Sequence, residues 1–250
     1  MSEFLMRDDA PLTGEEWERL DGVVEGAARQ FLVGRRFIEL AGPFGLGAEV
    51  VPVGSGEGRQ QVPLEVIQSD FPLLWQDIAA NRRLHVPIDL GLAAEAAFTC
   101  ARKEDKRIFE RLLSLEDRNT VSLLEWGEAG NPFQNVVDAT QGLVEDGFFG
   151  PYAVIVSPAL YNQTQRYGKG MRLESKLITD VASGGLFQSP VLKAEQGLVV
   201  SMGKHNLDLA IGQDLITAYM GNEELNHLFR VMETLALRVK RPQAICTLEA

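Results

Sequence analysis

Residues 89–113 read DLGLAAEAAFTCARKEDKRIFERLL and make the clearest long helix in the chain. Apolar side chains recur along this stretch at three-residue and four-residue spacing, which is typical of one buried face of an α-helix. They are Leu92, Ala96, Ala97, Cys100, Ile108, Phe109 and Leu112. The charged middle, residues 102–106, mixes both signs and indicates a solvated face rather than a site.

A second helix is predicted upstream of this stretch. Thr13 lies three residues before Glu16, the spacing of a capping box, in which each side chain bonds a free backbone N–H at the helix start. The apolar stripe that follows needs a partner surface. Its members are Trp17, Leu20, Val23, Val24, Ala27, Ala28, Phe31 and Leu32.

Between the two helices the sequence predicts extended structure. Residues 35–40 alternate well enough for a strand, which Gly42-Pro43 ends. Two further runs, 49–53 and 62–67, flank the glycine-rich residues 54–58 as a hairpin would. Because a two-stranded ribbon is marginal in water, we expect a neighbouring subunit to cover it.

After residue 113 the pattern alternates between the two element types. Helices are expected at residues 133–145 and 172–182. Strands are expected at 152–156, 197–201, 207–211, 228–240 and 245–248. The mixture predicts an α+β fold.

Composition narrows the class of protein. The 250 residues are 45% hydrophobic and 24% charged, enough for a sizeable core, and the net charge of −11 argues against a nucleic-acid binder. We expect no membrane span and no secretion signal, and therefore a cytoplasmic protein. Cys100 and Cys246 lie far apart without a partner motif and suit buried thiols in a reducing compartment.

No catalytic pattern emerges. His85, His205 and His227 share no metal-ligand spacing. Ser157 and Ser201 lack the glycine-flanked elbow of a nucleophilic serine. The glycine-rich residues 54–58 are not followed by the lysine and hydroxyl pair of a phosphate loop. We expect a protein that is not an enzyme and holds no metal.

Short strings of glycine and proline recur over nearly the whole chain in an order that resembles one protein family. The pairs Glu104-Asp105 and Ile108-Phe109 in the long helix belong to the same pattern. The strings are residues 10–13 (APLT), 42–45 (GPFG), 150–152 (GPY), 184–186 (GGL), 189–190 (SP) and 212–215 (GQDL). In this order they resemble the encapsulin shell proteins, which are related to the major capsid proteins of tailed phages. None of the strings holds a nucleophile or a metal cage, so they indicate backbone geometry.

The resemblance implies a tailed-bacteriophage major capsid protein-like fold of the α+β class. It implies an N-terminal helix and inner-wall strand at 1–47, an extended loop at 48–70, a peripheral domain with a spine helix at 71–132 and 229–250, and an axial domain at 133–228. The implied function is a self-assembling shell protomer of a nanocompartment, an icosahedral homo-oligomer of about 60 copies. The alternative is a phage or prophage capsid protein that encloses DNA, which the acidic charge disfavours.

The resemblance also implies an apolar groove that binds the C-terminal targeting peptide of a cargo enzyme, such as a dye-decolourising peroxidase or a ferritin-like protein. The matching positions are Phe31, Leu32, Arg35, Phe37, Ile38 and Glu39, with Ile245 as a second wall. Arg35 and Glu39 would fix the peptide register by charge. The competing interpretation is that Phe31 and Phe37 are ordinary core residues.

Two further sites follow from the resemblance alone. Tyr167, Gly168, Lys169 and Gly170 match a loop that lines a pore for small molecules in the family, where Lys169 would favour anions; the alternative is an ordinary surface loop. Trp75 matches a tryptophan beside which some encapsulins bind flavin. Gln68 stands where those members have an arginine, so we expect packing rather than a cofactor.

Overall fold

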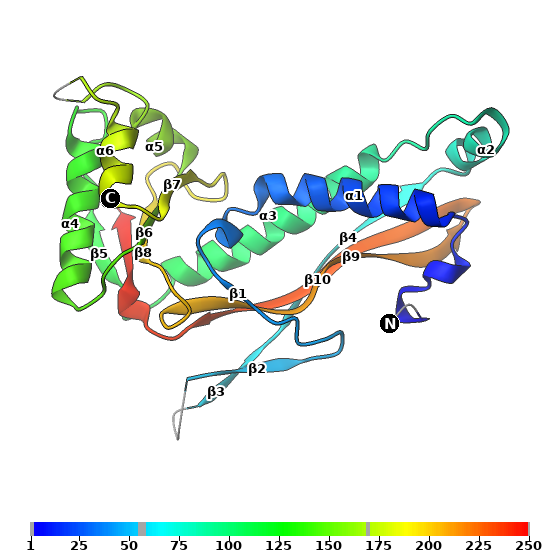
Figure 1. Ribbon diagram of the computed structural model, residues 1–250, viewed down its shortest axis with the longest axis horizontal. Helices are drawn as coiled ribbons and strands as arrows, with labels where there is room; N and C mark the ends of the chain where they lie inside the picture. Colours follow the sequence, from blue (N-terminus) through cyan, green and yellow to red (C-terminus); the bar gives the residue numbers. More distant parts are fainter. Residues whose placement is uncertain (1–2, 55–58, 169–170, 250) are drawn as a thin grey trace.

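The long axis of the molecule is formed by one helix and two strands that run along each other. In a computed structural model that describes residues 3–54, 59–168 and 171–249, these are α3 (Gly91–Leu113), β9 (Leu207–Glu223) and β10 (Asn226–Val239) (Figure 1). The expected long helix is confirmed, and its apolar face is buried: Ala97, Cys100 and Ile108 are wholly covered. The mixture of helices and sheets confirms the α+β class.

A four-stranded sheet lies under α3 in the order β1-β9-β10-β4, with β1 at Leu40–Ala41 and β4 at Glu65–Leu73. The two junctions that involve β10 are antiparallel, whereas β1 runs parallel to β9. The β9–β10 register shifts around Thr234, where two β-bulges bend the strands. Gly212 lies at this bend, and a Cβ there would come within 2.5 Å of the Thr234 Oγ1 atom.

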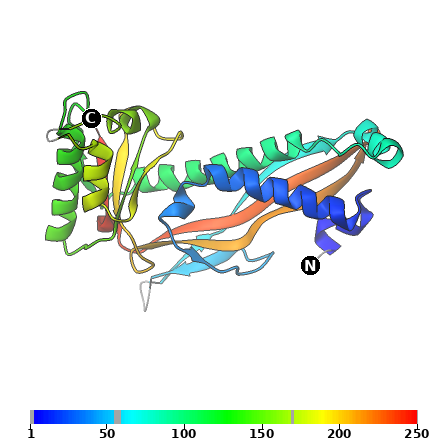
Figure 2. The same cartoon turned by 45° about the horizontal axis from the view of Figure 1, so that its top comes forward.

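The first long helix, α1 (Gly14–Phe31), lies beside α3 over the same sheet (Figure 2). Its predicted capping box is present, since the Thr13 hydroxyl accepts the Glu16 N–H and the Glu16 carboxylate accepts the Thr13 N–H. Trp17 and Leu20 are buried in the core that α1, α3 and the sheet share. The predicted apolar stripe therefore finds its partner surface within the same chain.

A five-stranded sheet forms the other end of the molecule (Figure 1). Its order is β5 (Asn119–Ser122), β11 (Ile245–Glu249), β8 (Gly197–Ser201), β6 (Tyr152–Val156) and β7 (Gly185–Gln188). Three helices pack around it, α4 (Asn131–Glu145), α5 (Pro158–Gln163) and α6 (Glu174–Val181). Every residue of β6 and β8 is buried, as the apolar run predicted.

Smaller elements lie at the margins. The hairpin of β2 (Val50–Val53) and β3 (Gln60–Pro63) projects from the sheet, and Val51 packs on Ala210 and Ala236. Helix α2 (Trp75–Leu84) lies at the end of the molecule opposite the five-stranded sheet. Among the described residues, short 3-10 helices lie at Glu3–Leu5, Arg7–Asp9, Gly34–Arg36 and Pro242–Ala244.

The strand predicted at residues 35–40 is wrong. Gly34–Arg36 forms a 3-10 turn, and only Leu40–Ala41 pairs as a strand. The cause is tertiary: Asp105 of α3 binds the backbone N–H groups of Val33 and Gly34 and holds them in a turn. Alternation of side chains could not reveal a carboxylate that arrives from another element.

The sheets also divide the chain differently from the predicted domains. The expected peripheral segment 229–250 is split, because β11 pairs with β5 and β8 in the five-stranded sheet. Conversely β9, which was placed in the axial domain, belongs to the four-stranded sheet with β10. The connection at Pro242–Ala244 is where the chain passes from one sheet to the other.

Both cysteines are buried, and burial raises the pKa of each thiol to about 12. Across the described ranges, no helix combines the length and the apolar character that a membrane crossing requires.

Candidate functional site: a groove between α1 and β9

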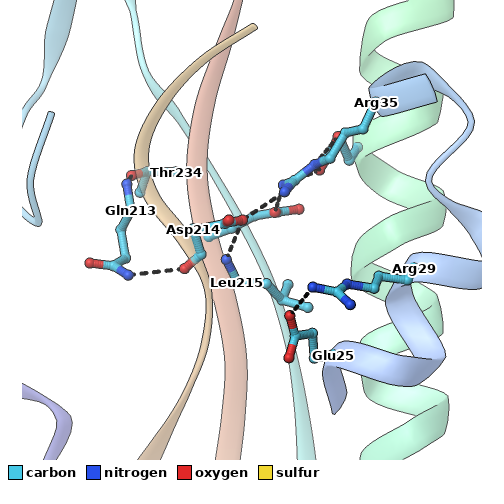
Figure 3. Close-up of polar contacts among 9 residues, drawn as sticks. Glu25, Arg29, Arg35, Gln213, Asp214, Leu215 and Thr234 are labelled. Atoms are coloured by element: carbon cyan, nitrogen blue, oxygen red, sulfur yellow. Dashed lines mark hydrogen bonds and ion pairs between the residues drawn. The ribbon is translucent and has the colours of Figure 1, made fainter. Parts of the chain in front are cut away.

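The largest cavity that we describe is an open groove of 740 Å³ between α1 and the outer edge of β9. Apolar side chains come from both walls, with Val24, Ala28 and Leu32 on the helix and Leu215 and Ile216 on the strand. Figure 3 shows the two walls facing each other, with Glu25 and Arg29 on the helix and Asp214 and Leu215 on the strand. The groove is therefore lined by aliphatic groups and bordered by charges. Its remaining lining residues are Arg7, Asp21, Glu25, Arg29, Arg35, Arg36, Leu40, Asp214 and Thr217.

Arg35 joins the groove to a buried acidic cluster. Its guanidinium lies 2.7 Å from Asp214 Oδ1, 2.8 Å from Glu104 Oε2 and 2.7 Å from Glu233 Oε2. The side chains of Glu104 and Glu233 are essentially inaccessible to solvent, whereas that of Asp214 is 56% exposed on the groove side. One cation thus compensates three carboxylates, two of them in the interior.

This arrangement perturbs the titration of its members. Burial alone would lower the pKa of Arg35, but its hydrogen bonds and ion pairs with Glu104, Glu233 and Asp214 raise it above the ordinary value. Burial, together with the charge of Glu104, raises the pKa of Glu233 well above its usual range. One oxygen of Glu233, Oε1, is buried without a hydrogen-bond partner. The cluster therefore favours a protonated Glu233.

The turn that follows α1 is fixed from below by Asp105. Its two carboxylate oxygens accept the N–H groups of Val33 and Gly34 at 3.0 and 2.9 Å. Burial raises the pKa of Asp105 to about 7, against the opposing effect of these two hydrogen bonds. A Cβ at Gly34 would come within 2.6 Å of Ile108 Cδ1, so a larger residue here would require the end of the Ile108 side chain to shift. The turn is thereby anchored on α3, and Arg35 is aimed into the cluster.

Ion pairs border the groove at the surface. Arg7 pairs with Asp21 at 2.5 Å and stacks over the ring of Trp17 at 4.2 Å. Arg29 pairs with Glu25 one helical turn away at 2.5 Å. Exposed pairs of this kind add little to stability, so their significance here is the mixed charge they give to the border.

The structure brings together only part of the predicted cargo-binding set. Leu32 and Arg35 line the groove. Phe31 points to the opposite side, where its ring meets Phe98 edge-on at 4.1 Å beside a separate cavity of 320 Å³.

The other predicted positions lie elsewhere. Phe37 and Ile38 are buried in the core, 2% and 3% exposed, so the core interpretation holds for Phe37. Glu39 faces a different cavity and pairs with Lys204 at 3.7 Å. Ile245 is buried in β11 of the five-stranded sheet and cannot form a second wall of this groove. The resemblance grouped these positions, and a groove floor and a core look alike in sequence, so the residues alone could not separate the two.

Sequence reasoning missed the β9 wall. Asp214 and Leu215 belong to the string GQDL, but that string was interpreted only as a bend. Ile216 and Thr217 carried no signal of their own. Only the folded chain shows that this strand lies opposite α1.

Two of the remaining predicted positions, Tyr167 and Trp75, are solvent-facing. Tyr167 is 70% exposed, whereas Lys169 and Gly170 lie outside the described residues. Trp75 is 44% exposed at the first position of α2, and its backbone N–H donates to Asn226. None of the cavities described above includes Trp75, and these contacts give flavin binding no support. No cluster of three or more metal-ligating side chains occurs among residues 3–54, 59–168 and 171–249.

Comparison with solved structures identifies the fold. A virus-like particle from Pyrococcus furiosus aligns with a TM-score of 0.82 at 18% identity, over 94% of this chain and 100% of that one. The capsid of Myoviridae phage XM1 aligns with a TM-score of 0.61 at 10% identity, over 88% and 92% of the two chains. The fold is that of the capsid-type shell proteins.

Sequence comparison gives the family. Residues 1–236 match the family model Linocin_M18, described as encapsulating protein for peroxidase. The type 1 encapsulin shell protein EncA of Myxococcus xanthus is 42% identical over all of this chain and 97% of its own. The chain belongs to the encapsulin shell protein family.

Proposed function

We propose that the chain is the protomer of an encapsulin nanocompartment, and that the groove between α1 and β9 binds a C-terminal targeting peptide of an enclosed enzyme. The observation that carries the proposal is the groove itself: aliphatic side chains from two elements, with a charged border and the Arg35 guanidinium fixed at its base. The chain's own contribution is assembly and enclosure, and the chemistry belongs to the enclosed enzyme.

The geometry suits an extended peptide with aliphatic side chains. Burial of leucine or isoleucine side chains against Val24, Leu32 and Ile216 supplies affinity, at about 25 cal/mol for each Å² of apolar surface removed from water. The ion pair between Arg35 and Asp214 lies at a fixed place in the groove. A charged group of the peptide can interact with it, which sets the register in which the peptide binds. The family description supports a peroxidase as the class of enclosed enzyme, and a ferritin-like protein is the second candidate.

We further propose an icosahedral shell of about 60 copies with pores for small molecules. Closed symmetry allows many modest interfaces to stabilise one container. The exposed Tyr167 and the neighbouring Gly168 are the described residues that we assign to a pore lining, with Lys169 and Gly170 completing the loop. The phage alternative is not favoured, because the 10% identity to a phage capsid concerns the fold alone and the chain carries a net charge of −11.

Assembly is tested first. Size-exclusion chromatography and negative-stain microscopy of the purified chain should show closed particles far larger than a monomer. A clean monomer at working concentration would contradict the shell proposal.

The groove is tested with a matched pair of variants on β9. Ile216 lines the groove, whereas Met220 is a 41% exposed apolar residue of the same strand outside it. The probe is a fluorescent octapeptide in which leucine and serine alternate, added while dissociated subunits reassemble. We expect Ile216→Glu shells to assemble and lose at least tenfold in bound probe, and Met220→Glu shells to bind it as the wild type does. Equal binding by the wild type and Ile216→Glu would place the docking site elsewhere.

A further inference from the structure

A second cavity lies at the junction of the two sheets, and we call it the junction cavity. Its volume is 550 Å³, which is within the range of small-molecule sites, and such sites often form where two packed units meet. Its lining comes from the turn between α4 and β6, the turn between β8 and β9, and the link from β10 to β11. Among the described residues it shares no lining position with the groove between α1 and β9.

Arg241, on the link from β10 to β11, gives the junction cavity a cation with free donors. Its guanidinium lies over the ring of Phe148, with the Cζ atom 4.2 Å from the ring centroid, and this contact holds the planar group in place. Its side chain makes one long hydrogen bond, to Asn206 Oδ1 at 3.4 Å, and no ion pair within the ranges that the structure describes. Because a guanidinium carries five N–H donors in a planar fork, Arg241 is suited to bind an oxyanion.

Further positive charge comes from the turn between β8 and β9. Lys204 lines the junction cavity, and the carboxylate among the described lining residues is that of Glu39, which lies 3.7 Å from the Lys204 Nζ atom. Both side chains are more than half exposed, so this ion pair is weak. Next to the turn, Lys240 donates to the Lys204 carbonyl at 2.5 Å and shares the carboxylate of Asp208 with Arg238. Cations thus outnumber carboxylates here, in a chain whose net charge is −11.

The rest of the lining is apolar and partly aromatic. Phe149 is 67% exposed and lines the junction cavity together with Pro151 and Met202. The imidazole of His205 adds a second flat ring, which lies so close to the turn that a Cβ at Gly203 would come within 2.6 Å of its Cε1 atom. An exposed aromatic ring can stack with a flat group of a ligand. The cavity therefore combines a cationic part with an aromatic part.

We propose that the junction cavity binds a small phosphate monoester with an aromatic body. The phosphate oxygens accept hydrogen bonds from Arg241 and Lys204, and the flat body of the ligand packs on Phe149. A phosphate suits this lining because its three free oxygens can contact more than one cation at once. The inference goes beyond the proposed function, since here the shell subunit itself holds a small ligand. It depends neither on the groove nor on the identity of the enclosed enzyme.

Four probes test the two parts of the lining separately. Assembled shells are titrated calorimetrically at low ionic strength with phenyl phosphate, inorganic phosphate, phenol and benzoate. We expect phenyl phosphate to bind at least tenfold more tightly than inorganic phosphate or phenol, because each of those uses only one part of the lining. Benzoate should bind at least threefold more weakly, since it has two oxygens and a single charge. Equal affinity for phenyl phosphate and any other probe, or no binding of phenyl phosphate, would overturn the proposal.

Arg241→Met tests the cationic part. It removes the guanidinium donors and should weaken the binding of both phosphates at least tenfold, the loss expected for a hydrogen bond to a charged group. Lys204→Met, at an exposed turn position, should weaken binding about threefold to tenfold, and it tests the same site if Arg241→Met shells do not assemble. The matched control is Lys193→Met, an exposed cation that lines none of the cavities described above. Equal losses in Lys193→Met and Lys204→Met would mean that diffuse surface charge attracts the probe, and the site would be rejected.

Phe149→Ser tests the aromatic part. It should lower the affinity for phenyl phosphate about tenfold and leave that for inorganic phosphate unchanged. Phe4→Ser is the matched control, since Phe4 is 81% exposed and lies outside the junction cavity. An unchanged affinity of Phe149→Ser for phenyl phosphate would contradict the placement of the ligand body.

The failure of this inference is distinguishable from that of the proposed function. Ile216→Glu shells, altered in the groove, should bind phenyl phosphate as the wild type does. If dissociated subunits bind the probe and assembled shells do not, a neighbouring copy covers the junction cavity and the inference is wrong, while the shell proposal stands.

Discussion

The two sheets of this chain are built in opposite ways. In the five-stranded sheet, β6 and β8 are buried along their whole length, and alternate residues of β6 serve two cores, with Ile155 on one side and Val154 on the other. In the four-stranded sheet, Glu233 and Asp208 are buried carboxyl groups, and among the described residues no strand pairs with the outer side of β9 beyond Gly212. One sheet is an apolar scaffold, and the other contains buried acidic groups and forms one wall of the groove.

The buried charges of the long sheet are themselves of two kinds. Asp208 is fully compensated, by Arg238 at 2.6 Å and Lys240 at 2.7 Å. Glu233 shares a single guanidinium with two other carboxylates and keeps one oxygen unpaired. The difference teaches that the acidic group with an unpaired oxygen lies next to Arg35 at the groove, while the fully paired carboxylate of Asp208 lies away from it, where it joins β9 to β10 through Arg238.

The largest effect is expected in the apolar scaffold. Ile155→Asp places a carboxylate in a fully buried strand with no cation to receive it, so we expect a loss of more than about 4 kcal/mol and no soluble shell. Ile155→Val is the control and should cost about 1 kcal/mol while leaving assembly intact. Expression followed by size-exclusion chromatography checks both. Assembled Ile155→Asp shells would mean that the five-stranded sheet is not the scaffold.

A smaller but still large effect is expected at the centre of the acidic cluster. Arg35→Met keeps an unbranched stem, shortens the side chain and removes the guanidinium that pairs with Glu104 and Glu233, which should cost about 3–5 kcal/mol. The matched control is Arg172→Met, which breaks the exposed pair with Asp180 and should cost less than about 1 kcal/mol. Urea unfolding of dissociated subunits measures both. Similar losses of unfolding free energy in Arg35→Met and Arg172→Met would show that the acidic cluster is accessible to solvent.

The smallest effect depends on pH. The pKa of Glu233 is raised in the folded chain, so its contribution to stability is present below the ordinary value of 4.5 and is lost as the pH rises through the folded value. The raised pKa of Asp105 has the same effect: its contribution to stability is lost as the pH rises from 3.8 to about 7. Glu233→Gln removes the ionisable group. The free energy of unfolding of this variant should therefore rise relative to that of the wild type as the pH is raised, by up to about 1.4 kcal/mol for each pH unit in that window.

Thermal unfolding of wild-type and Glu233→Gln shells between pH 5 and 9 measures this difference, with Asp180→Asn as an exposed control. Parallel curves for the wild type and Glu233→Gln would show that Glu233 is ionised in the folded chain at all of these pH values.

Local pattern was enough for much of the fold. The capping box at Thr13 and Glu16, the apolar face of α3 and the buried run of β6 each depend on residues near in sequence, and each was predicted correctly. The turn at Gly34–Arg36 and the transfer of β11 to the other sheet were not, because both depend on partners far along the chain.

The site was less accessible to sequence reasoning for the same reason. Leu32 and Arg35 were assigned to a groove by the resemblance to the shell family, and both line the groove. The opposite wall comes from β9, about 180 residues later, and no pattern in residues 214–217 identifies it as a wall. Phe37 was wrongly grouped with the groove because apolar character alone does not tell a buried side chain from a binding surface.

The close approach at Gly34 has a consequence for how the chain can diversify. A larger residue there would require the Ile108 side chain to shift, and the two N–H groups held by Asp105 belong to the backbone, so this anchor depends on Asp105 rather than on the side chains of the turn. The groove-lining positions Ile216 and Glu25 belong to other turns and strands and take no part in the anchor. Substitutions at these positions can therefore change the surface of the groove while the turn that follows α1 keeps its position.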